Sequence, residues 1–465
     1  MDQKIIKKIS AIVGADQITT AKEELLCYSY DGTGREFIPS AVAFPGSTHE
    51  ISQIMQLANS EILPVVIRGA GTGMTGGALP VAGGLVLAMS RMNKIIEIDA
   101  ANQIAVVEPG VITGELRQAA AEVGLYYPPD PASYKFCTMG GNVAECAGGP
   151  SAVKYGVTRD YVLGLEAVLA DGRVITTGVR TAKGVVGYDL TRLLVGSEGT
   201  LAVITKIIVK LIAAPAGRET FLVLCPDMGA ATGLVAKILG RLTPCTLEYL
   251  DRTAIAIVNH KLPFPLPETT GALLLIELDG DPETLAVTGR RLNDFLNDQS
   301  GVIETRHARS REEAEQLWAA RRSVSPAAFS LKPDKISEDV VVPKSLIPEL
   351  VSCTERLGRE QDLTIFTFGH AGDGNIHVNI MLDKSRPEEV ARAERAKRLL
   401  FTEVLKLGGT LSGEHGVGIT KADYLGLEIS DPTLGLMRQV KTMFDPNNIL
   451  NPGKIFPAAP ESKNN

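Results

Sequence analysis

The residues best suited to catalysis or metal binding are the histidines, of which the chain has only six. Three of them fall in two glycine-rich segments. His370 and His377 lie in "FGHAGDGNIHVNI" (368–380), and Glu414 and His415 lie in "GGTLSGEHGVG" (408–418). Two imidazoles and a carboxylate suit a divalent metal ion with open coordination positions. We therefore expect a metal centre, the plainer alternative being that the histidines are only hydrogen-bonded polar residues beside a turn.

The pattern alone leaves the carboxylate ligand open. Glu414 is one candidate, and Asp373 is another, although its place between two glycines is more typical of a turn residue. In "NIHVNI", Asn375, His377 and Asn379 alternate with isoleucine and valine. Because successive side chains of a strand point to opposite faces, we expect the apolar face to meet the core and the polar face to line a cleft.

A third segment, "LPVVIRGAGTGMTGGALP" (63–80), has Gly71, Gly73 and Gly76 at the G-x-G-x-x-G spacing of dinucleotide-binding loops. In a Rossmann fold that motif opens a helix, whose N-terminus holds the pyrophosphate. Here a proline and a Gly-Gly pair follow, and then a strand, which excludes the Rossmann interpretation. A P-loop is excluded because no G-K-[ST] is present.

We predict instead that this loop joins two strands and that its backbone N–H groups form a nest for phosphate oxygens. Thr72 and Thr75 add hydroxyl donors, and Arg68 is expected at the entrance. Two more glycine-rich segments follow, "PPDPASYKFCTMGGNVAECAGGPSAVKYGVTRDYVLGLE" (128–166) and "LLVGSEGTLAVITKI" (193–207). Their glycines are too dense for a core and too ordered for a linker, which favours further ligand-binding loops.

Composition narrows the class of protein. A chain of 465 residues predicts two to four domains. The net charge of −7 argues against nucleic-acid binding. The sequence shows neither a signal peptide nor a run of apolar residues long enough to span a membrane, so we expect a cytoplasmic protein. The six cysteines form no C-x-x-C pair, which argues against a disulfide framework and against an iron–sulfur cluster in this chain.

The elements that must position these residues fall into three parts. Residues 1–215 alternate strand-like and helix-like runs, with a hairpin predicted at "GLEAVLADGRVITTG" (164–178). Residues 216–410 alternate strands with longer amphipathic helices and predict a separate α+β domain. Residues 411–465 have too little apolar sequence for a core of their own, and we expect them to pack back on the first domain. The expected fold class is α+β.

The three glycine-rich segments before residue 210 resemble, in order and spacing, the flavin-binding domain of the vanillyl-alcohol-oxidase or PCMH type. The resemblance implies an FAD-binding domain of two α+β subdomains, a ferredoxin-like α+β substrate (cap) domain and a C-terminal helical segment. Many relatives attach FAD through a histidine of the first loop; this loop has none, so we expect non-covalent FAD. The resemblance assigns to the cofactor Arg68, Gly69, Ala70, Gly71, Thr72, Gly73, Met74, Thr75, Gly76, Pro129, Ser133, Gly140, Gly141, Asn142, Ala144, Glu145, Gly148, Gly149, Tyr155, Gly156, Ile204 and Asn451.

The histidine segments resemble those of the FAD-linked D-2-hydroxyacid dehydrogenases, a branch with glycolate oxidase catalytic subunits, D-lactate dehydrogenases and D-2-hydroxyglutarate dehydrogenases. This resemblance implies His370, His377 and Glu414 as ligands of Zn²⁺, Fe²⁺ or Mn²⁺, Asn379 as a substrate contact and His415 as the base. A Lewis-acidic metal that lowers the pKa of the α-hydroxyl, and a histidine that takes its proton, are chemically consistent with that reaction.

The distal end of the substrate is expected to meet residues of the helix-like run "SREEAEQLWAARRSVSPAAF" (310–329). Helical spacing puts Arg321 and Ser325 on one face, and Lys335 follows. The hydroxyglutarate enzymes hold the distal carboxylate with an Arg, a Thr and a Lys at corresponding places, so Ser325 replaces the Thr here. Lys332 is an alternative to Lys335, and Arg321 can equally be a solvated helix residue.

The predicted function is therefore metal-assisted, FAD-dependent oxidation of D-lactate or glycolate to the 2-oxo acid. The alternatives are a D-2-hydroxyglutarate dehydrogenase, a non-catalytic flavoprotein subunit of a glycolate oxidase-type complex, and a metallohydrolase without FAD. With neither a cluster nor a nicotinamide motif in the chain, the electrons are expected to pass to a partner. An iron–sulfur subunit, an electron-transfer flavoprotein or a quinone-linked protein would serve, and a homodimer is left open.

Overall fold

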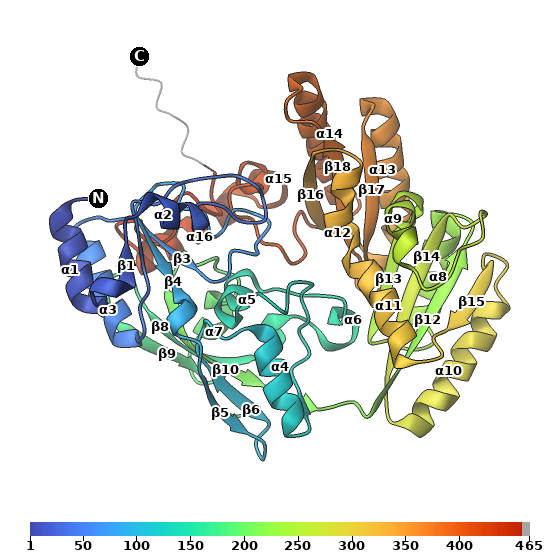
Figure 1. Ribbon diagram of the computed structural model, residues 1–465, viewed down its shortest axis with the longest axis horizontal. Coiled ribbons are helices and arrows are strands. Elements are labelled where there is room, and N and C mark those ends of the chain that lie inside the picture. The colour runs from blue at the N-terminus through green and yellow to red at the C-terminus, as the bar shows by residue number, and fades with distance from the viewer. Residues whose placement is uncertain (458–465) are drawn as a thin grey trace. The chain divides into compact units, whose positions relative to one another are not determined.

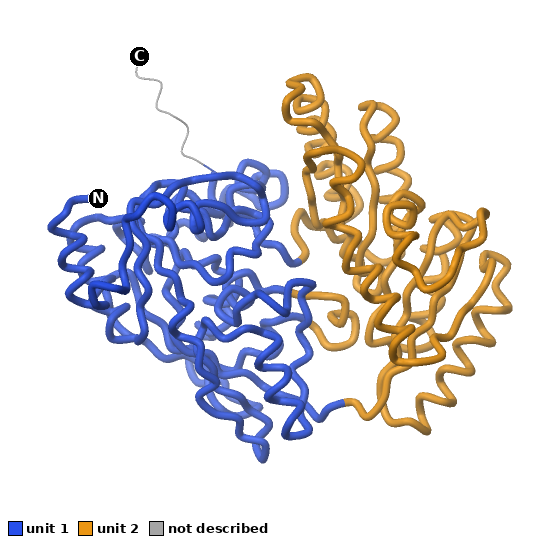
Figure 2. Tube along the Cα trace, viewed as in Figure 1, with its two compact units in different colours: residues 1–147, 157–214, 414–465 blue, residues 148–156, 215–413 orange. Residues whose placement is uncertain are grey.

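The computed structural model describes residues 1–457 and divides into two compact units (Figure 2). Unit 1 comprises residues 1–147, 157–214 and the chain from Glu414 onward, and unit 2 comprises residues 148–156 and 215–413. The chain therefore leaves unit 1 close to the predicted border at 215. The segment 148–156, which the prediction placed in the first domain, clusters with unit 2.

Unit 1 begins with a four-stranded sheet (Figure 1) in the order β1 (Ile18–Thr19), β2 (Ala41–Ala43), β4 (Leu85–Ala88) and β3 (Val65–Arg68). Strands β2, β4 and β3 are parallel. The helices of this region are α1 (Gln3–Val13), α2 (Lys22–Cys27) and α3 (Thr48–Ser60). Helix α3 is capped by the hydroxyl of Ser47, which accepts from the Glu50 N–H, and its buried Ile51, Ile54 and Ala58 recur at helical spacing.

A second, five-stranded antiparallel sheet has the order β5 (Ile95–Asp99), β6 (Ile104–Val107), β10 (Val203–Lys210), β8 (Val162–Val168) and β9 (Val174–Gly178). The predicted hairpin is confirmed, because β8 and β9 pair around Gly172 at φ +86°. The other elements of this part are α4 (Thr113–Glu122), α5 (Met139–Glu145), α7 (Leu190–Leu194) and the short pair β7 (Leu125–Tyr126) with β11 (Ile212–Ala213).

The C-terminal part of unit 1 holds the helices α15 (Leu425–Glu428) and α16 (Asp431–Phe444). After α16 the chain runs alongside β3. The Val65 N–H donates to the Ile449 carbonyl at 2.7 Å, and the Asn451 N–H donates to the Val65 carbonyl at 2.8 Å. Residues 449–451 thus form an isolated β-bridge, Leu450 to Val65, with the strand that leads into the glycine-rich loop.

Unit 2 contains a seven-stranded sheet, all antiparallel, in the order β15-β12-β14-β13-β17-β18-β16. The chain order is β12 (Gly217–Cys225), α8 (Met228–Leu239), β13 (Thr246–Asp251), α9 (Arg252–Val258), β14 (Ala272–Gly280), α10 (Pro282–Asn297), β15 (Glu304–His307), α11 (Arg311–Arg322), α12 (Val324–Ala327), β16 (Asp334–Val341), α13 (Ile347–Gln361), β17 (Thr364–His370), β18 (Asn375–Leu382) and α14 (Pro387–Lys406). Helix α6 (Ala152–Tyr155) also belongs to this unit.

The first half of this sheet has the strand order 4-1-3-2 of the ferredoxin-like β-α-β-β-α-β pattern, with α9 inserted between its second and third strands. The second half repeats its first three strands, since β16, β17 and β18 lie in the order 2-3-1. The halves join where β13 pairs with β17. The predicted α+β class is confirmed.

The two faces of the unit 2 sheet are covered by different helices. One face carries Leu250, Phe366 and Phe368, which pack with residues of α9, α11 and α12. The opposite face carries Ile380 and Leu382, which pack with α14. Alternation along β18 therefore sends Asn375, His377, Asn379 and Met381 to the face of α9, α11 and α12.

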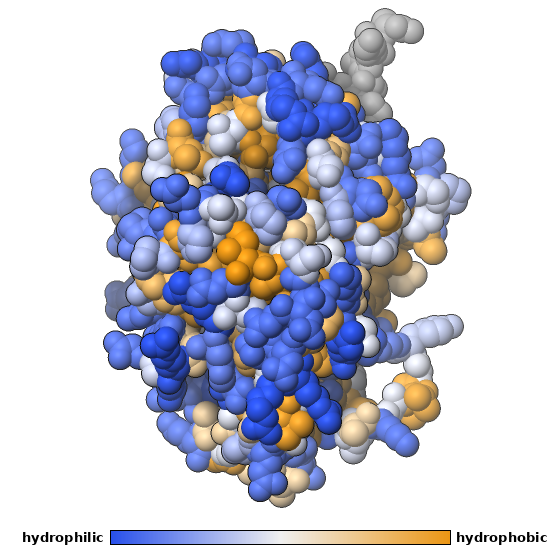
Figure 3. Space-filling model, turned by 90° about the vertical axis from the view of Figure 1, so that its right-hand side faces the viewer, coloured by the Kyte–Doolittle hydropathy of each residue, from blue (hydrophilic) through white to orange (hydrophobic). Residues whose placement is uncertain are grey.

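The surface drawn in Figure 3 is largely hydrophilic, with hydrophobic side chains in small groups. Within residues 1–457, the helices are too short or too polar to traverse a lipid bilayer.

Candidate active site

The two predicted metal-binding histidines lie on the β17–β18 hairpin of unit 2. His370 ends β17 opposite Asn375, and His377 of β18 lies opposite Phe368. The hairpin bends back at Gly374, where φ is +92°. Both imidazoles are buried, and their Nε2 atoms are 3.3 Å apart. A local turn and strand register therefore bring the two rings together.

This spacing fits a metal ion. Two nitrogens bound to a tetrahedral zinc ion at about 2.05 Å lie about 3.3 Å apart, the observed Nε2–Nε2 distance. A carboxylate oxygen of Glu414 joins them, and one ligand atom of each of the three residues lies within 4.8 Å of the others. Two neutral imidazoles and one carboxylate leave positions for exogenous oxygen ligands.

Glu414 follows Gly413, the last residue of unit 2, and Gly413 is held by Asp339 of β16. The Gly413 N–H donates to the Asp339 carbonyl at 3.1 Å and to its carboxylate at 2.9 Å. Asp339 is fully buried and lies opposite His377 in the sheet. The strand that neighbours one histidine thus also fixes the peptide from which Glu414 projects.

Behind His370 lies Glu248 of β13, a residue that the sequence interpretation missed. Its carboxylate is fully buried, with one oxygen 2.6 Å from His370 Nδ1. The other oxygen accepts from Arg321 Nε at 2.7 Å and pairs with Nη2 at 2.5 Å. Burial alone would raise the pKa of Glu248, but the charges of His370 and Arg321 and their hydrogen bonds lower it. The sequence signal that could have identified Glu248 is a glutamate within the otherwise largely apolar strand "TLEYLD".

Arg321 lies at the end of α11, where its guanidinium stacks on Phe368 at 4.6 Å. Arg321 is buried and ion-paired, so the solvated-helix alternative is wrong. The expected continuous helix through Ser325 is also wrong, because α11 ends at Arg322 and α12 begins at Val324.

Lys335 reaches Ser325 from the neighbouring strand β16. Its ammonium donates to the Ser325 hydroxyl at 2.6 Å and to its carbonyl at 3.1 Å. Burial lowers the pKa of Lys335 to about 8, and no carboxylate of residues 1–457 pairs with it. The alternative cation, Lys332, is engaged by Glu389 at 3.2 Å. Of the two lysines, Lys335 is therefore the one whose charge is not already paired with a carboxylate and can attract an anion.

Asn379 shares the face of His377 and is completely buried. Its side-chain oxygen accepts from the Ser337 hydroxyl at 3.2 Å. Its amide nitrogen has no hydrogen-bond partner within residues 1–457. A buried donor of this kind is costly unless a ligand satisfies it.

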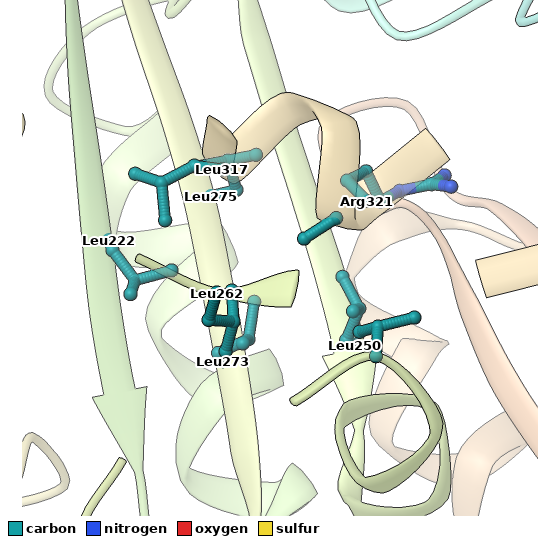
Figure 4. A pocket seen from close by; sticks show the side chains of 9 residues that line it. Leu222, Leu250, Leu262, Leu273, Leu275, Leu317 and Arg321 are labelled. Atoms are coloured by element: carbon teal, nitrogen blue, oxygen red, sulfur yellow. The ribbon is translucent and has the colours of Figure 1, made fainter. Parts of the chain in front are cut away.

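The structure also has a cavity near this site, between the sheet and α11 (Figure 4). Its walls are leucine, valine and alanine side chains and the stem of Arg321, whose guanidinium points away from the leucines. An apolar space of this kind does not suit the carboxylate of a hydroxy acid.

The glycine-rich loop of unit 1 connects β3 to β4 without a helix, as predicted. Gly71 and Gly76 have φ of +69° and +85°, conformations that favour glycine. A Cβ on Gly71 would lie 2.2 Å from Arg68 Nη2. Arg68 is buried and its Nη2 donates to the Tyr30 carbonyl at 2.8 Å, whereas its Nη1 has no hydrogen-bond partner within residues 1–457. Its expected role in binding the cofactor stays a prediction.

Thr75 has a different role from the one expected. Its hydroxyl donates to the His415 carbonyl at 3.0 Å rather than standing free for a phosphate, and its own carbonyl accepts from Ile419 N–H at 2.8 Å. The loop that contains His415 is also held by Glu198, whose carboxylate accepts from the N–H groups of Val417 and Gly418, each at 2.7 Å. The loop that carries His415 is thus anchored on the glycine-rich loop of unit 1.

The C-terminal residues support that glycine-rich loop. Asn451 donates to the carbonyls of Gly77 at 2.9 Å and Glu198 at 2.6 Å, and Lys454 donates to the Gly77 and Leu79 carbonyls. These hydrogen bonds fix the main chain at the end of the glycine-rich loop.

The second glycine cluster has two parts. In unit 1, Thr138 caps α5, and the Asn142 side chain donates to Thr113 at 2.7 Å, which makes Asn142 part of the packing. In unit 2, Tyr155 donates to Asp279 at 2.5 Å. Gly148, Gly149 and Gly156 also fall in unit 2, whereas Pro129, Ser133, Gly140, Gly141, Ala144, Glu145 and Ile204 fall in unit 1 with Gly69, Ala70, Thr72, Gly73 and Met74.

Two family descriptions match the chain. Residues 39–178 match "FAD binding domain", and residues 214–455 match "FAD linked oxidases, C-terminal domain". The chain belongs to the FAD-linked oxidases. It is an FAD-linked oxidoreductase, and the positive φ of Gly71 and Gly76 and the open space around Gly73 fit a cofactor cradle.

Relatives of this oxidase span nearly its whole length. "Glycolate oxidase subunit GlcD" of Bacillus subtilis is 43% identical over 97% of this chain and 96% of its own. "D-lactate dehydrogenase" of Anaerostipes hadrus is 35% identical over 90% and 89%. "D-2-hydroxyglutarate dehydrogenase" of Stutzerimonas stutzeri is 31% identical over 98% and 100%. The fold matches p-cresol methylhydroxylase with a TM-score of 0.80 over 97% of this chain and 96% of that one, at 21% identity, which confirms the PCMH-type fold.

Proposed function

We propose that this oxidase converts a small D-2-hydroxy acid, D-lactate or glycolate, to the 2-oxo acid in the cytoplasm, with non-covalent FAD and a divalent metal ion. The observation that carries the proposal is the cluster of His370, His377 and Glu414. The two histidines share a sheet face with Asn379, whose amide nitrogen has no hydrogen-bond partner within residues 1–457. The relatives named for glycolate, D-lactate and D-2-hydroxyglutarate support this substrate class.

When bound, FAD accepts the hydrogen and two electrons from C2, and the divalent metal acts as a Lewis acid toward the α-hydroxyl and the carboxylate. The residues of this chain bind and orient the acid. Asn379 donates its free amide hydrogen to a substrate oxygen, and Lys335 or Arg321 provides positive charge for the carboxylate. His415 takes the hydroxyl proton, with its main chain held by Thr75.

The electrons then pass to a protein partner, for which an iron–sulfur subunit or an electron-transfer flavoprotein is suited. The word "subunit" in the names of two relatives supports a complex. The six cysteines are free, and five of them are buried, so none forms a redox disulfide in this structure. A homodimer is compatible with this proposal but is not required by it.

The test is anaerobic. The purified protein is mixed separately with D-lactate, L-lactate, glycolate and D-2-hydroxyglutarate, and flavin absorbance near 450 nm is followed before and after metal removal with EDTA. Bleaching by D-lactate or glycolate that is lost with EDTA and restored by Zn²⁺ or Mn²⁺ supports the proposal. Bleaching by D-2-hydroxyglutarate alone reassigns the substrate, and a yellow protein that no acid bleaches identifies a non-catalytic subunit. Bleaching that survives EDTA removes the metal from the mechanism.

A further inference from the structure

We propose that Glu248 is a positioning residue that prepares His370 to bind the metal and that ties this ligand to Arg321. The inference rests on the proposed function, because it assigns a purpose to a residue behind the proposed metal ligands. It requires nothing of the substrate beyond an anionic group.

The first step concerns the tautomer of His370. A neutral imidazole carries one N–H, and the carboxylate of Glu248 can only accept. With a carboxylate oxygen 2.6 Å from Nδ1, that nitrogen must carry the hydrogen. The lone pair then lies on Nε2, the nitrogen 3.3 Å from His377 Nε2. Glu248 therefore selects the ligand atom that faces the metal position, and its negative charge makes that nitrogen a stronger donor.

The second step concerns Arg321. The second Glu248 oxygen accepts a hydrogen bond from Arg321 Nε and forms an ion pair with Nη2. Within residues 1–457, Nη1 has no hydrogen-bond partner, and the guanidinium plane lies over Phe368 at 4.6 Å. Phe368 in turn lies 5.2 Å from the His377 ring, measured between centroids. Glu248 thus orients Arg321 with one nitrogen left to interact with an anion.

The third step concerns why a buried carboxylate is retained at all. Glu248 is fully buried in the middle of the sheet, and an apolar residue there would avoid its desolvation cost. A second buried glutamate in the same sheet, Glu277 of β14, also pairs with an arginine, Arg218, and accepts from Trp318 Nε1 at 2.7 Å. Glu277 does not contact a histidine in any hydrogen bond of the described chain. The histidine contact therefore distinguishes Glu248 from a carboxylate that only supports the fold.

The test compares Glu248→Gln with Glu277→Gln in the full-length protein. The amide keeps the shape, but it cannot accept from both His370 and Arg321. We expect Glu248→Gln to bind Zn²⁺ roughly 10- to 100-fold more weakly than wild type. The measurement is competition against a chromophoric chelator, with FAD content and thermal unfolding recorded in parallel. Glu277→Gln should keep wild-type metal affinity, and both variants should keep their FAD.

The outcomes separate the inference from the proposed function. If wild type binds no divalent metal, the metal step of the proposed function fails and the inference falls with it. If wild type binds Zn²⁺ and Glu248→Gln binds it within about threefold of wild type, the inference alone is overturned. Equal losses in both variants would reduce Glu248 to a structural residue.

A second variant covers the event that Glu248→Gln does not fold. Glu248→Asp keeps the charge but is one methylene shorter, so it cannot reach both partners. We expect intermediate Zn²⁺ affinity from this variant, and wild-type affinity would overturn the proposal. In the wild-type protein, ¹⁵N-histidine NMR should show His370 protonated at Nδ1, and an Nε2–H tautomer would contradict the first step directly.

Discussion

Replacing Gly71 with alanine should destabilise the protein even without FAD. At φ +69° an alanine costs roughly 1–2 kcal/mol. Its Cβ would also lie 2.2 Å from Arg68 Nη2, so the guanidinium must leave the Tyr30 carbonyl. Losing that charged hydrogen bond costs about 1.5–3 kcal/mol. The free energy of unfolding should therefore fall by about 2.5–5 kcal/mol, which lowers the unfolding temperature of a 465-residue chain by roughly 3–5 °C.

Gly73→Ala is the matched control in the same motif. Gly73 has an ordinary φ, and nothing lies within 4 Å of its Cβ position. We expect its apoprotein to unfold within about 0.5 kcal/mol of wild type. If the loop cradles phosphate through its backbone, however, Gly73→Ala should weaken FAD binding. Calorimetry of the apoproteins and FAD titration separate the two effects. Unfolding of Gly71→Ala at the wild-type temperature would refute the packing argument, and full FAD affinity of Gly73→Ala would refute the cradle.

Three further predictions concern the supports of the site. Thr75→Val removes the hydrogen bond to the His415 carbonyl, which contributes about 1 kcal/mol, so kcat should fall while FAD stays bound. Loss of FAD from this variant would show instead that the hydroxyl holds phosphate. With a pKa of about 8, Lys335 loses its charge as pH rises through 8, so kcat/KM should fall above that pH and Lys335→Gln should abolish this decline. Asn451→Ala should lower the free energy of unfolding by about 2 kcal/mol more than Asn448→Ala does. Both residues have a positive φ, but only the Asn451 amide donates to the carbonyls of Gly77 and Glu198. Equal losses in the two variants would contradict this.

Local signals in the sequence were sufficient for the glycine-rich loop and the histidine hairpin. Glycine and proline decide backbone geometry at their own positions, so the loop between β3 and β4 could be separated from a Rossmann turn. The alternation in "NIHVNI" likewise fixed which residues share a face, and burial of Ile376, Val378 and Ile380 confirms the apolar side. Both predictions needed only neighbours within a few residues.

Contacts between segments far apart in the sequence could not be predicted from these local signals. Arg68 Nη2 donates to Tyr30, which lies 38 positions away, and the Thr75 hydroxyl donates to His415, which lies 340 positions away. The residue types alone suggested phosphate donors in both cases. The partner that a polar side chain finds depends on which strands become neighbours, and a single sequence does not reveal that pairing.

The break between α11 and α12 was predictable but missed. Pro326 lies four residues after Arg322 and has no N–H to donate to the Arg322 carbonyl. The helix that carries Arg321 therefore ends at Arg322, and Ser325 lies in a new short helix, α12, where its hydroxyl accepts from Lys335. Helical spacing was applied across a residue that interrupts it.

Glu248 suggests a more general rule for finding the chemistry of such a sheet. An inward-facing strand position normally carries an apolar side chain, because burying a charge or an amide costs free energy. Here one face of the unit 2 sheet holds Glu248, His370, His377, Asn379 and Asp339, all buried. They break the apolar pattern on four adjacent strands, at positions that the register brings together. Such local violations are expected where function requires them, so a polar residue at an inward position is a better pointer to the site than its residue type.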